Sequence, residues 1–221
     1  MATRGKKALY VGASLLLTLI AGLVVIIEQS RVSPNAIRAS VTRSDGSIEK
    51  AWNLPVAAMF KREVMWQSNP SMCGPASVAN VLRSMDAPDA SEDGVLKGTG
   101  LCWSGSCFMG LTLDELSSVA KSKTKHSVTV LRDLTPEEFR EHLRRSNETD
   151  RRYIINFSRA EIFGSGSGHH SPIGGYLEEE NLVFALDVNR DYQPWLINRS
   201  RLFKAMNTFD GNRKRGLLMI E

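Results

Sequence analysis

The sequence predicts an α+β domain in which helices come first and an antiparallel sheet follows. Apolar side chains recur at helical spacing after residue 73, and two capping patterns mark further helices before residue 146. After residue 149 the chain changes to short runs that are rich in β-branched and aromatic side chains. A length of 221 residues, with 42% hydrophobic and 24% charged side chains, suits one globular domain.

An uncharged apolar run from Ala8 to Ile27 opens the chain. It is as long as the roughly 20 residues that cross a bilayer, and it is preceded by three cations, Arg4, Lys6 and Lys7. These cations predict a cytoplasmic N-terminus and place the chain after about Ser30 outside the cytoplasm. Residues 1–30 are therefore predicted to anchor a periplasmic domain in the membrane, or to be the signal sequence of a secreted domain if the segment is cleaved.

The next residues, 31–50, are polar and irregular, and we expect a linker there with at most one short strand. The folded domain is then predicted to span residues 51–221. Within it, Thr112 and Thr135 each precede a glutamate by three positions, which is the capping-box pattern, so helices are expected over about 112–122 and 135–145. Four strands are expected: Tyr153–Phe157, Ser171–Tyr176, Leu182–Val188 and Gly216–Ile220.

The charge balance excludes one class of partner. Lys and Arg number 28 against 24 Asp and Glu, a net charge of +4, and part of the excess lies at the two ends of the chain. No basic stripe interleaved with aromatic residues is present, which argues against nucleic-acid binding. A homodimer is left open by the composition.

The centre of the functional prediction is Cys73. Its position precedes apolar residues at i, i+3, i+4 and i+7 of one predicted helix, namely Val78, Val81, Leu82 and Met85. A thiolate at the positive end of a helix dipole is stabilised, so the pKa of Cys73 is expected to be low and the thiol nucleophilic. Gln67, six residues upstream, supplies an amide that could stabilise an oxyanion. The alternative is a buried structural cysteine.

A cysteine nucleophile needs a base and a group that orients this base. Among the 4 histidines, His169 and His170 follow a Gly/Ser run and open a predicted strand, where successive side chains point to opposite faces. We therefore expect only one of the two imidazoles to reach the thiol. Asp187 ends the next strand and is the expected partner of this histidine. Two surface histidines and a turn-forming aspartate are the alternatives.

These residues fall in three motifs: Gln67-x5-Cys73-Gly74, Gly168-His169-x-Ser171-Pro172-Ile173-Gly174-Gly175-Tyr176 and Leu186-Asp187-Val188-x-Arg190. The motifs resemble the phytochelatin synthase family of papain-like thiol enzymes, over about residues 51–195. The resemblance implies a papain-like fold, with the nucleophile helix packed on an antiparallel sheet. It also implies that His169, rather than His170, is catalytic and that Asp187 orients it. The substrate-binding residues that it implies are Gly168, Ser171, Arg159 and Arg190, the last as a clamp for a carboxylate.

The activity that the resemblance implies is the removal of glycine from glutathione. A γ-Glu-Cys thioester on Cys73 would pass to water, or to a second glutathione to form a phytochelatin, with no resident cofactor. A cadmium or zinc ion would enter as a thiolate complex of glutathione. Two departures favour hydrolysis: Gly74-Pro75 replaces the Gly-Leu of plant members, and the chain ends at Glu221 without their cysteine-rich extension.

Cys102 and Cys107 lie five positions apart, which is not the spacing of a Cys-x-x-Cys zinc pair. A disulfide is the favoured role outside the cytoplasm, and heavy-metal binding or no role at all are the alternatives. Two other functions also stay open. One is a leader-peptide peptidase similar to the protease domains of bacteriocin exporters. The other is a membrane-tethered metal-binding module that uses these cysteines together with His169 and His170.

Overall fold

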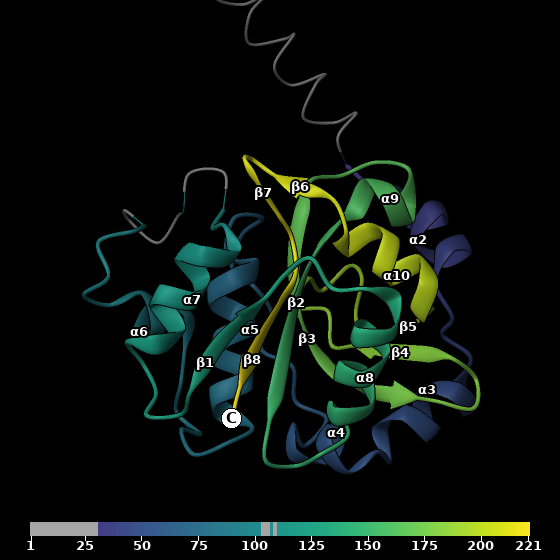
Figure 1. Cartoon of the computed structure of the whole chain (residues 1–221), viewed down its shortest axis with the longest axis horizontal. Coiled ribbons are helices and arrows are strands. Elements are labelled where there is room, and N and C mark those ends of the chain that lie inside the picture. The colour runs from purple at the N-terminus through teal and green to yellow at the C-terminus, as the bar shows by residue number, and fades with distance from the viewer. Residues whose placement is uncertain (1–30, 103–106, 108–109) are drawn as a thin grey trace, which may run out of the picture.

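The computed structural model describes residues 31–102, 107 and 110–221. The predicted anchor, from Ala8 to Ile27, lies outside the described residues. Within the described ranges, no helix has the length and apolar character that a membrane crossing requires. The predicted α+β class is confirmed, with N-terminal helices packed on an antiparallel sheet (Figure 1).

A six-stranded antiparallel sheet forms the centre of the domain, in the order β1-β8-β2-β3-β4-β5. Its strands are β1 (Val128–Leu131), β2 (Arg152–Ser158), β3 (Gly168–Leu177), β4 (Leu182–Ala185), β5 (Trp195–Asn198) and β8 (Leu217–Ile220). The four predicted strands correspond to β2, β3, β4 and β8. Strands β1 and β5, of four residues each, were not predicted.

Helices cover both faces of this sheet (Figure 1). On one face lie α5 (Cys73–Arg83), α6 (Glu92–Leu96) and α7 (Leu113–Lys121), and on the other lie α8 (Pro136–Arg145), α9 (Arg159–Phe163) and α10 (Arg199–Met206). Helix α5 is the most enclosed of them, because every residue from Cys73 to Leu82 is buried. The predicted helices after Thr112 and Thr135 are confirmed, and both capping boxes are formed.

The segment 31–50 was predicted to be an irregular linker, and this prediction is wrong. It contains α2 (Pro34–Ser40) and most of α3 (Asp45–Trp52), which α4 (Pro55–Met59) follows. Ile37 is buried in the core, and the ring of Trp52 packs edge-on against Phe184 at a centroid distance of 5.0 Å. Each helix is so short that a single apolar residue or pair anchors it, and no helical periodicity shows in the sequence.

His142, on α8, is half-buried. Its Nδ1 lies 3.2 Å from the hydroxyl oxygen of Tyr153. Burial lowers the pKa of His142, and the neighbouring Arg145 adds to this effect. His142 therefore has a structural contact that joins α8 to β2, and it contacts none of the predicted catalytic residues.

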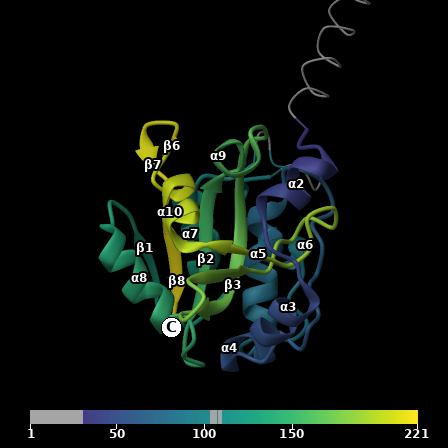
Figure 2. The ribbon, with the colours of Figure 1, turned by 90° about the vertical axis from the view of Figure 1, so that its right-hand side faces the viewer.

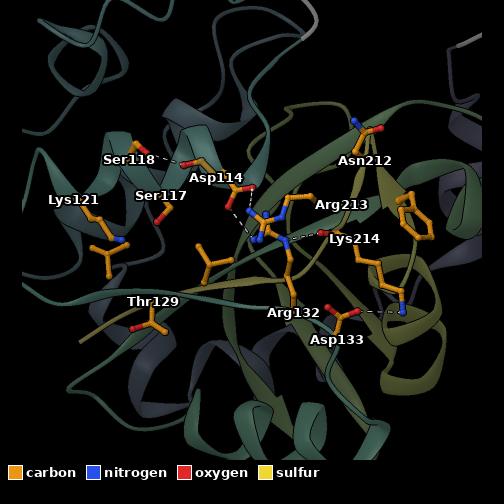
Figure 3. A pocket seen from close by; sticks show the side chains of 13 residues that line it. Asp114, Ser117, Ser118, Lys121, Thr129, Arg132, Asp133, Asn212, Arg213 and Lys214 are labelled. Atoms are coloured by element: carbon orange, nitrogen blue, oxygen red, sulfur yellow. Dashed lines mark hydrogen bonds and ion pairs between the residues drawn. The ribbon is translucent and has the colours of Figure 1, made fainter.

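A small hairpin of β6 (Phe209–Asp210) and β7 (Arg213–Lys214) projects from the end of the sheet where β3 begins (Figures 1 and 2). Ion pairs hold it against α7 and β1. The carboxylate of Asp114 lies 3.0 Å from Arg213 and 3.0 Å from Arg132. These residues line an open hollow of about 960 Å³ between α7, β1 and the hairpin (Figure 3). The hollow contains no predicted catalytic residue, and its ion pairs fix the position of the hairpin.

Candidate active site

The nucleophile lies at the first residue of α5. Cys73 is only 5% exposed, and it is a free thiol. The hydroxyl of Ser77, one helical turn later, donates hydrogen bonds to the carbonyl oxygens of Cys73 and His170, at 2.7 and 3.1 Å. This hydroxyl therefore ties the start of α5 to β3. The predicted position of a thiol at a helix N-terminus against the sheet is observed.

The predicted base and its orienting group are in contact. Nε2 of His169 lies 2.8 Å from Oδ1 of Asp187, and both side chains are fully buried. The backbone N–H of Asn189 donates to the same carboxylate oxygen, and the indole N–H of Trp195 donates to the other, at 3.0 Å. Asp187 is thus held by three groups, and it fixes the ring of His169 so that Nδ1 is the nitrogen left for chemistry.

Both histidines interact with the thiol, although we expected only one to reach it. The charge of His169 acts on Cys73, and Nδ1 of His170 lies 3.9 Å from Sγ. The two residues are neighbours in β3, so their side chains start from opposite faces of the sheet. In the register with β2, His169 is opposite Phe157 and His170 is opposite Asn156. However, β3 pairs with β4 only from Ile173 onwards, so its first residues have no second neighbouring strand.

The charges of the site favour a thiolate and an imidazolium. Burial by itself would raise the pKa of Cys73, but the charge of His169 and the contact with His170 hold this pKa well below its usual value. For His169, burial opposes the charged form, whereas the charges of Asp187 and Cys73 favour it and raise the pKa to about 9. Burial likewise opposes ionisation of Asp187, and the charge of His169 outweighs it, so the pKa of Asp187 is lowered. This ion pair is the active form of a cysteine nucleophile.

We expect the alkylation of Cys73 to report this ion pair directly. The rate constant with iodoacetamide should stay high through neutral pH, where an ordinary thiol with a pKa of 9.0 is protonated. It should fall only at acid pH, as the thiolate takes up a proton. Replacing His169 with asparagine removes the main favourable charge, and the inflection should then move to alkaline pH. An inflection near pH 9 in the unmodified chain would contradict the structure.

A backbone hydrogen bond holds Gln67 close to Asp187 in the chain fold. Its N–H donates to the carbonyl oxygen of Val188, directly after Asp187, at 2.8 Å. The side-chain nitrogen donates to the carbonyl of Asn69, also at 2.8 Å, which leaves one amide N–H for another acceptor. The predicted role of Gln67 at an oxyanion is therefore compatible with its position and stays a prediction.

An ionic cluster that the sequence analysis missed lies against Gly168, the residue before His169. Nη1 of Arg215 donates to the side-chain oxygen of Asn156 at 2.7 Å and lies 3.2 Å from a carboxylate oxygen of Asp210. Its side chain is only 10% exposed, and Nε is buried without a hydrogen-bond partner among the described residues. Burial lowers the pKa of Arg215, whereas the negative charges of Asp210 and Cys73 raise it. The chain therefore has a cation and an anion against the start of β3, where His169 lies.

A comparison with known protein families identifies the family of this chain. Residues 27–217 match the phytochelatin synthase family, which is most of the chain. The chain belongs to this family. Among its relatives, glutathione gamma-glutamylcysteinyltransferase 3 of Lotus japonicus is 30% identical over 65% of this chain, and the Schizosaccharomyces pombe enzyme is 24% identical over 72%. The matches span only 32% and 42% of the lengths of these two proteins.

Solved structures place the fold of this phytochelatin synthase family member among papain-like peptidases. A putative C39-like peptidase from Bacillus anthracis aligns over 73% of this chain and 95% of its own, with a TM-score of 0.54 and 12% identity. The peptidase domain of Streptococcus ComA aligns over 72% of this chain and 96% of its own, with a TM-score of 0.50 and 14% identity. At these identities the similarity shows the fold alone, and the predicted papain-like fold is confirmed.

The four predicted substrate-binding residues differ in their positions. Gly168 is in close contact with Arg215, because a Cβ on this glycine would lie 2.3 Å from Nη1. Ser171 is fully buried, and its hydroxyl has no hydrogen-bond partner among the described residues. Arg159 lies 5.6 Å above the ring of Tyr192, which in turn stacks on His169. Arg190 is exposed and has no ion pair with any residue that the structure describes. Its role as a clamp stays a prediction.

Cys102 and Cys107 form a disulfide, which was the favoured alternative. In this form neither sulfur is a thiolate, so the two residues are not metal ligands here, and no group of three metal-binding side chains occurs in the described ranges. The disulfide also lies close to the nucleophile: the N–H of Cys107 donates to the hydroxyl of Ser71 at 3.2 Å, and its sulfur is 3.8 Å from that of Met72. It therefore ties the loop around residue 102 to the residues directly before Cys73.

Proposed function

We propose that this member of the phytochelatin synthase family cleaves the Cys–Gly bond of glutathione and forms a γ-Glu-Cys thioester on Cys73. The observation that supports this substrate is the pair of Arg215 and Asp210, which lies against Gly168, the residue before His169. The γ-glutamyl end of glutathione has a carboxylate and an ammonium on one carbon, and a fixed cation–anion pair matches both. The names of the relatives, glutathione gamma-glutamylcysteinyltransferases, point to the same substrate.

In the first step, Sγ of Cys73 attacks the carbonyl carbon of the Cys–Gly amide. The negative charge that develops on the carbonyl oxygen is accepted by the free amide N–H of Gln67 and by a backbone N–H at the start of α5. The imidazolium of His169 then gives its Nδ1 proton to the glycine nitrogen. The C–N bond breaks, glycine leaves as an amine, and the acyl group stays on sulfur.

In the second step, neutral His169 removes a proton from the acyl acceptor. With water as the acceptor, the attack on the thioester releases γ-glutamylcysteine; with the amine of a second glutathione, it releases a phytochelatin. The carbon–sulfur bond breaks in both cases, and the thiolate and imidazolium return. Asp187 keeps the ring of His169 oriented and stabilises its charge throughout.

Two further features belong to the proposal. Glutathione bound to cadmium or zinc through its thiolate would enter as substrate, with the protein itself holding no resident metal. The catalytic domain would work outside the cytoplasm, tethered by residues 8–27. The disulfide between Cys102 and Cys107 supports this location, because such bonds persist in oxidising compartments.

The direct test is a product analysis. The full chain is incubated with glutathione, with and without cadmium, and the products are identified by mass. Glycine with γ-glutamylcysteine indicates hydrolysis, and glycine with a longer γ-Glu-Cys peptide indicates transfer. No glycine under either condition would reject glutathione as the substrate, and cleavage of a peptide after Gly-Gly would point to the leader-peptide peptidase instead.

Arg215 offers a sharper test of how glutathione is recognised. Replacing it with glutamine should lower kcat/KM for glutathione by about 10- to 100-fold, since a hydrogen bond to a charged group contributes about 1.5–3 kcal/mol. A substrate that lacks the γ-glutamyl α-carboxylate, 4-aminobutyryl-cysteinyl-glycine, should be cleaved equally slowly by both chains. Arg140→Gln, on α8 and paired with Glu178, is the control and should leave kcat/KM near its original value. A loss on the shortened substrate as large as on glutathione would contradict the assignment.

A further inference from the structure

We propose that His170 is a second catalytic residue, whose Nδ1–H donates a hydrogen bond to the Cys73 thiolate. The two atoms are 3.9 Å apart, which is within the range of hydrogen bonds to sulfur. The family resemblance implies a role for His169 only, and the proposed mechanism uses only His169 for proton transfer. The inference concerns the reactive thiol itself, so it needs Cys73 to be nucleophilic but does not depend on glutathione as the substrate.

The contact between His170 and the thiol is held from several directions. The ring is 2% exposed, so water does not compete for the bond. The hydroxyl of Ser77 donates to the backbone carbonyls of both Cys73 and His170, which fixes the two residues relative to each other. The other ring nitrogen, Nε2, is buried without a hydrogen-bond partner among the described residues. In the neutral ring, the proton is therefore best placed on Nδ1, where it has the sulfur as its acceptor.

The other charged groups that face the thiolate define what His170 adds. His169 approaches from the same strand with Asp187 behind it, and Arg215 acts from the position directly after β7. The proton on His169 leaves with glycine in each turnover, so His169 is neutral while the thioester is attacked. A donor that keeps its proton can stabilise the departing thiolate in this second step. His170 has no part in the proton transfer, and it supplies such a donor.

The test is the pH dependence of Cys73 alkylation in three variants of the full chain. Asparagine places its amide nitrogen near the position of Nδ1, glutamine places it near that of Nε2, and phenylalanine has no donor. His170→Phe and His170→Gln should raise the pKa of the thiol by about one unit, while His170→Asn should keep most of the original value. The sequence has 3 cysteines and two of them are paired, so iodoacetamide reports on one thiol under non-reducing conditions.

The outcomes separate a hydrogen bond from a packing role. If His170→Phe does not fold, the comparison of the asparagine and glutamine variants still decides, because both are polar amides. An unchanged pKa in both His170→Gln and His170→Phe, or an equal rise in His170→Asn and His170→Gln, would overturn the proposal. His142→Phe, at the half-buried histidine on α8, is the control and should leave the pKa of the thiol unchanged. Alkylation needs no substrate, so failure of the glutathione assay leaves this result intact.

Discussion

Serine in place of Cys73 is expected to lower the release of glycine from glutathione by at least about 10³-fold, the scale on which removal of a catalytic nucleophile acts. The change replaces one atom, so the shape of the buried site is kept. The reason for the loss is electrostatic. The charge of His169 and the nearby hydrogen bonds bring a thiol into its ionised form, whereas a hydroxyl stays protonated under the same conditions.

The control for this variant is binding. Cys73→Ser and Cys73→Ala should both bind glutathione with a Kd close to that of the unmodified chain, measured by calorimetry, because Arg215 and Asp210 are unchanged. The Tm of both variants should also stay close to that of the unmodified chain, since Cys73 is the first residue of α5 and belongs to a small cluster outside the two main core clusters. Glycine release from Cys73→Ala at the full rate would rule out a thioester mechanism.

The parts of the fold that the sequence predicts well are those with local signals. The two capping boxes depend on residues three positions apart, such as Thr112 and Glu115, and both form as predicted. Long strands such as β2 show several apolar residues in one run. In contrast, α2 and α3 are held by contacts with distant residues, for example the pairing of Thr42 with Leu196, and no local pattern reports such contacts.

The active site shows the same division. Cys73, His169 and Asp187 are predictable because three motifs contain them, and the structure brings them together. Arg215 is one of three consecutive cations, and in the sequence it resembles Arg213, which is exposed on the hairpin. Only the contact with Gly168, and the register that brings Asn156 beside it, distinguish the buried cation. Gly168 could have indicated this contact, because a glycine has no side chain and allows another group to approach the backbone closely.

The second large effect is expected at Asp187. Replacing it with asparagine should lower kcat for glycine release by roughly 10³-fold or more, as the same change does in triads where the carboxylate orients the histidine. Asparagine can donate to the ring of His169 as well as accept from it, so the ring can take the tautomer with the proton on the wrong nitrogen. Trp195→Phe is the matched control: it removes one donor to the same carboxylate but keeps the charge, and it should cost only about 10-fold.

The pH dependence of stability identifies the cause of this effect. In the unmodified chain the pKa of His169 is raised from 6.5 to about 9, so the ion pair with Asp187 stabilises the fold fully below pH 6.5, and this stabilisation is lost as the pH rises through 9. Without the carboxylate charge, the pKa of His169 falls and burial of the ring favours its neutral form. Cys73 contributes with the opposite sign over the same range, because its pKa is lowered in the folded chain, so both chains carry Cys73→Ser in this experiment. The free energy of unfolding in urea from pH 6 to 10 should decrease above pH 6.5 in Cys73→Ser and should lack this decrease when Asp187→Asn is added. Parallel curves for the two chains would mean that Asp187 acts on His169 by position alone.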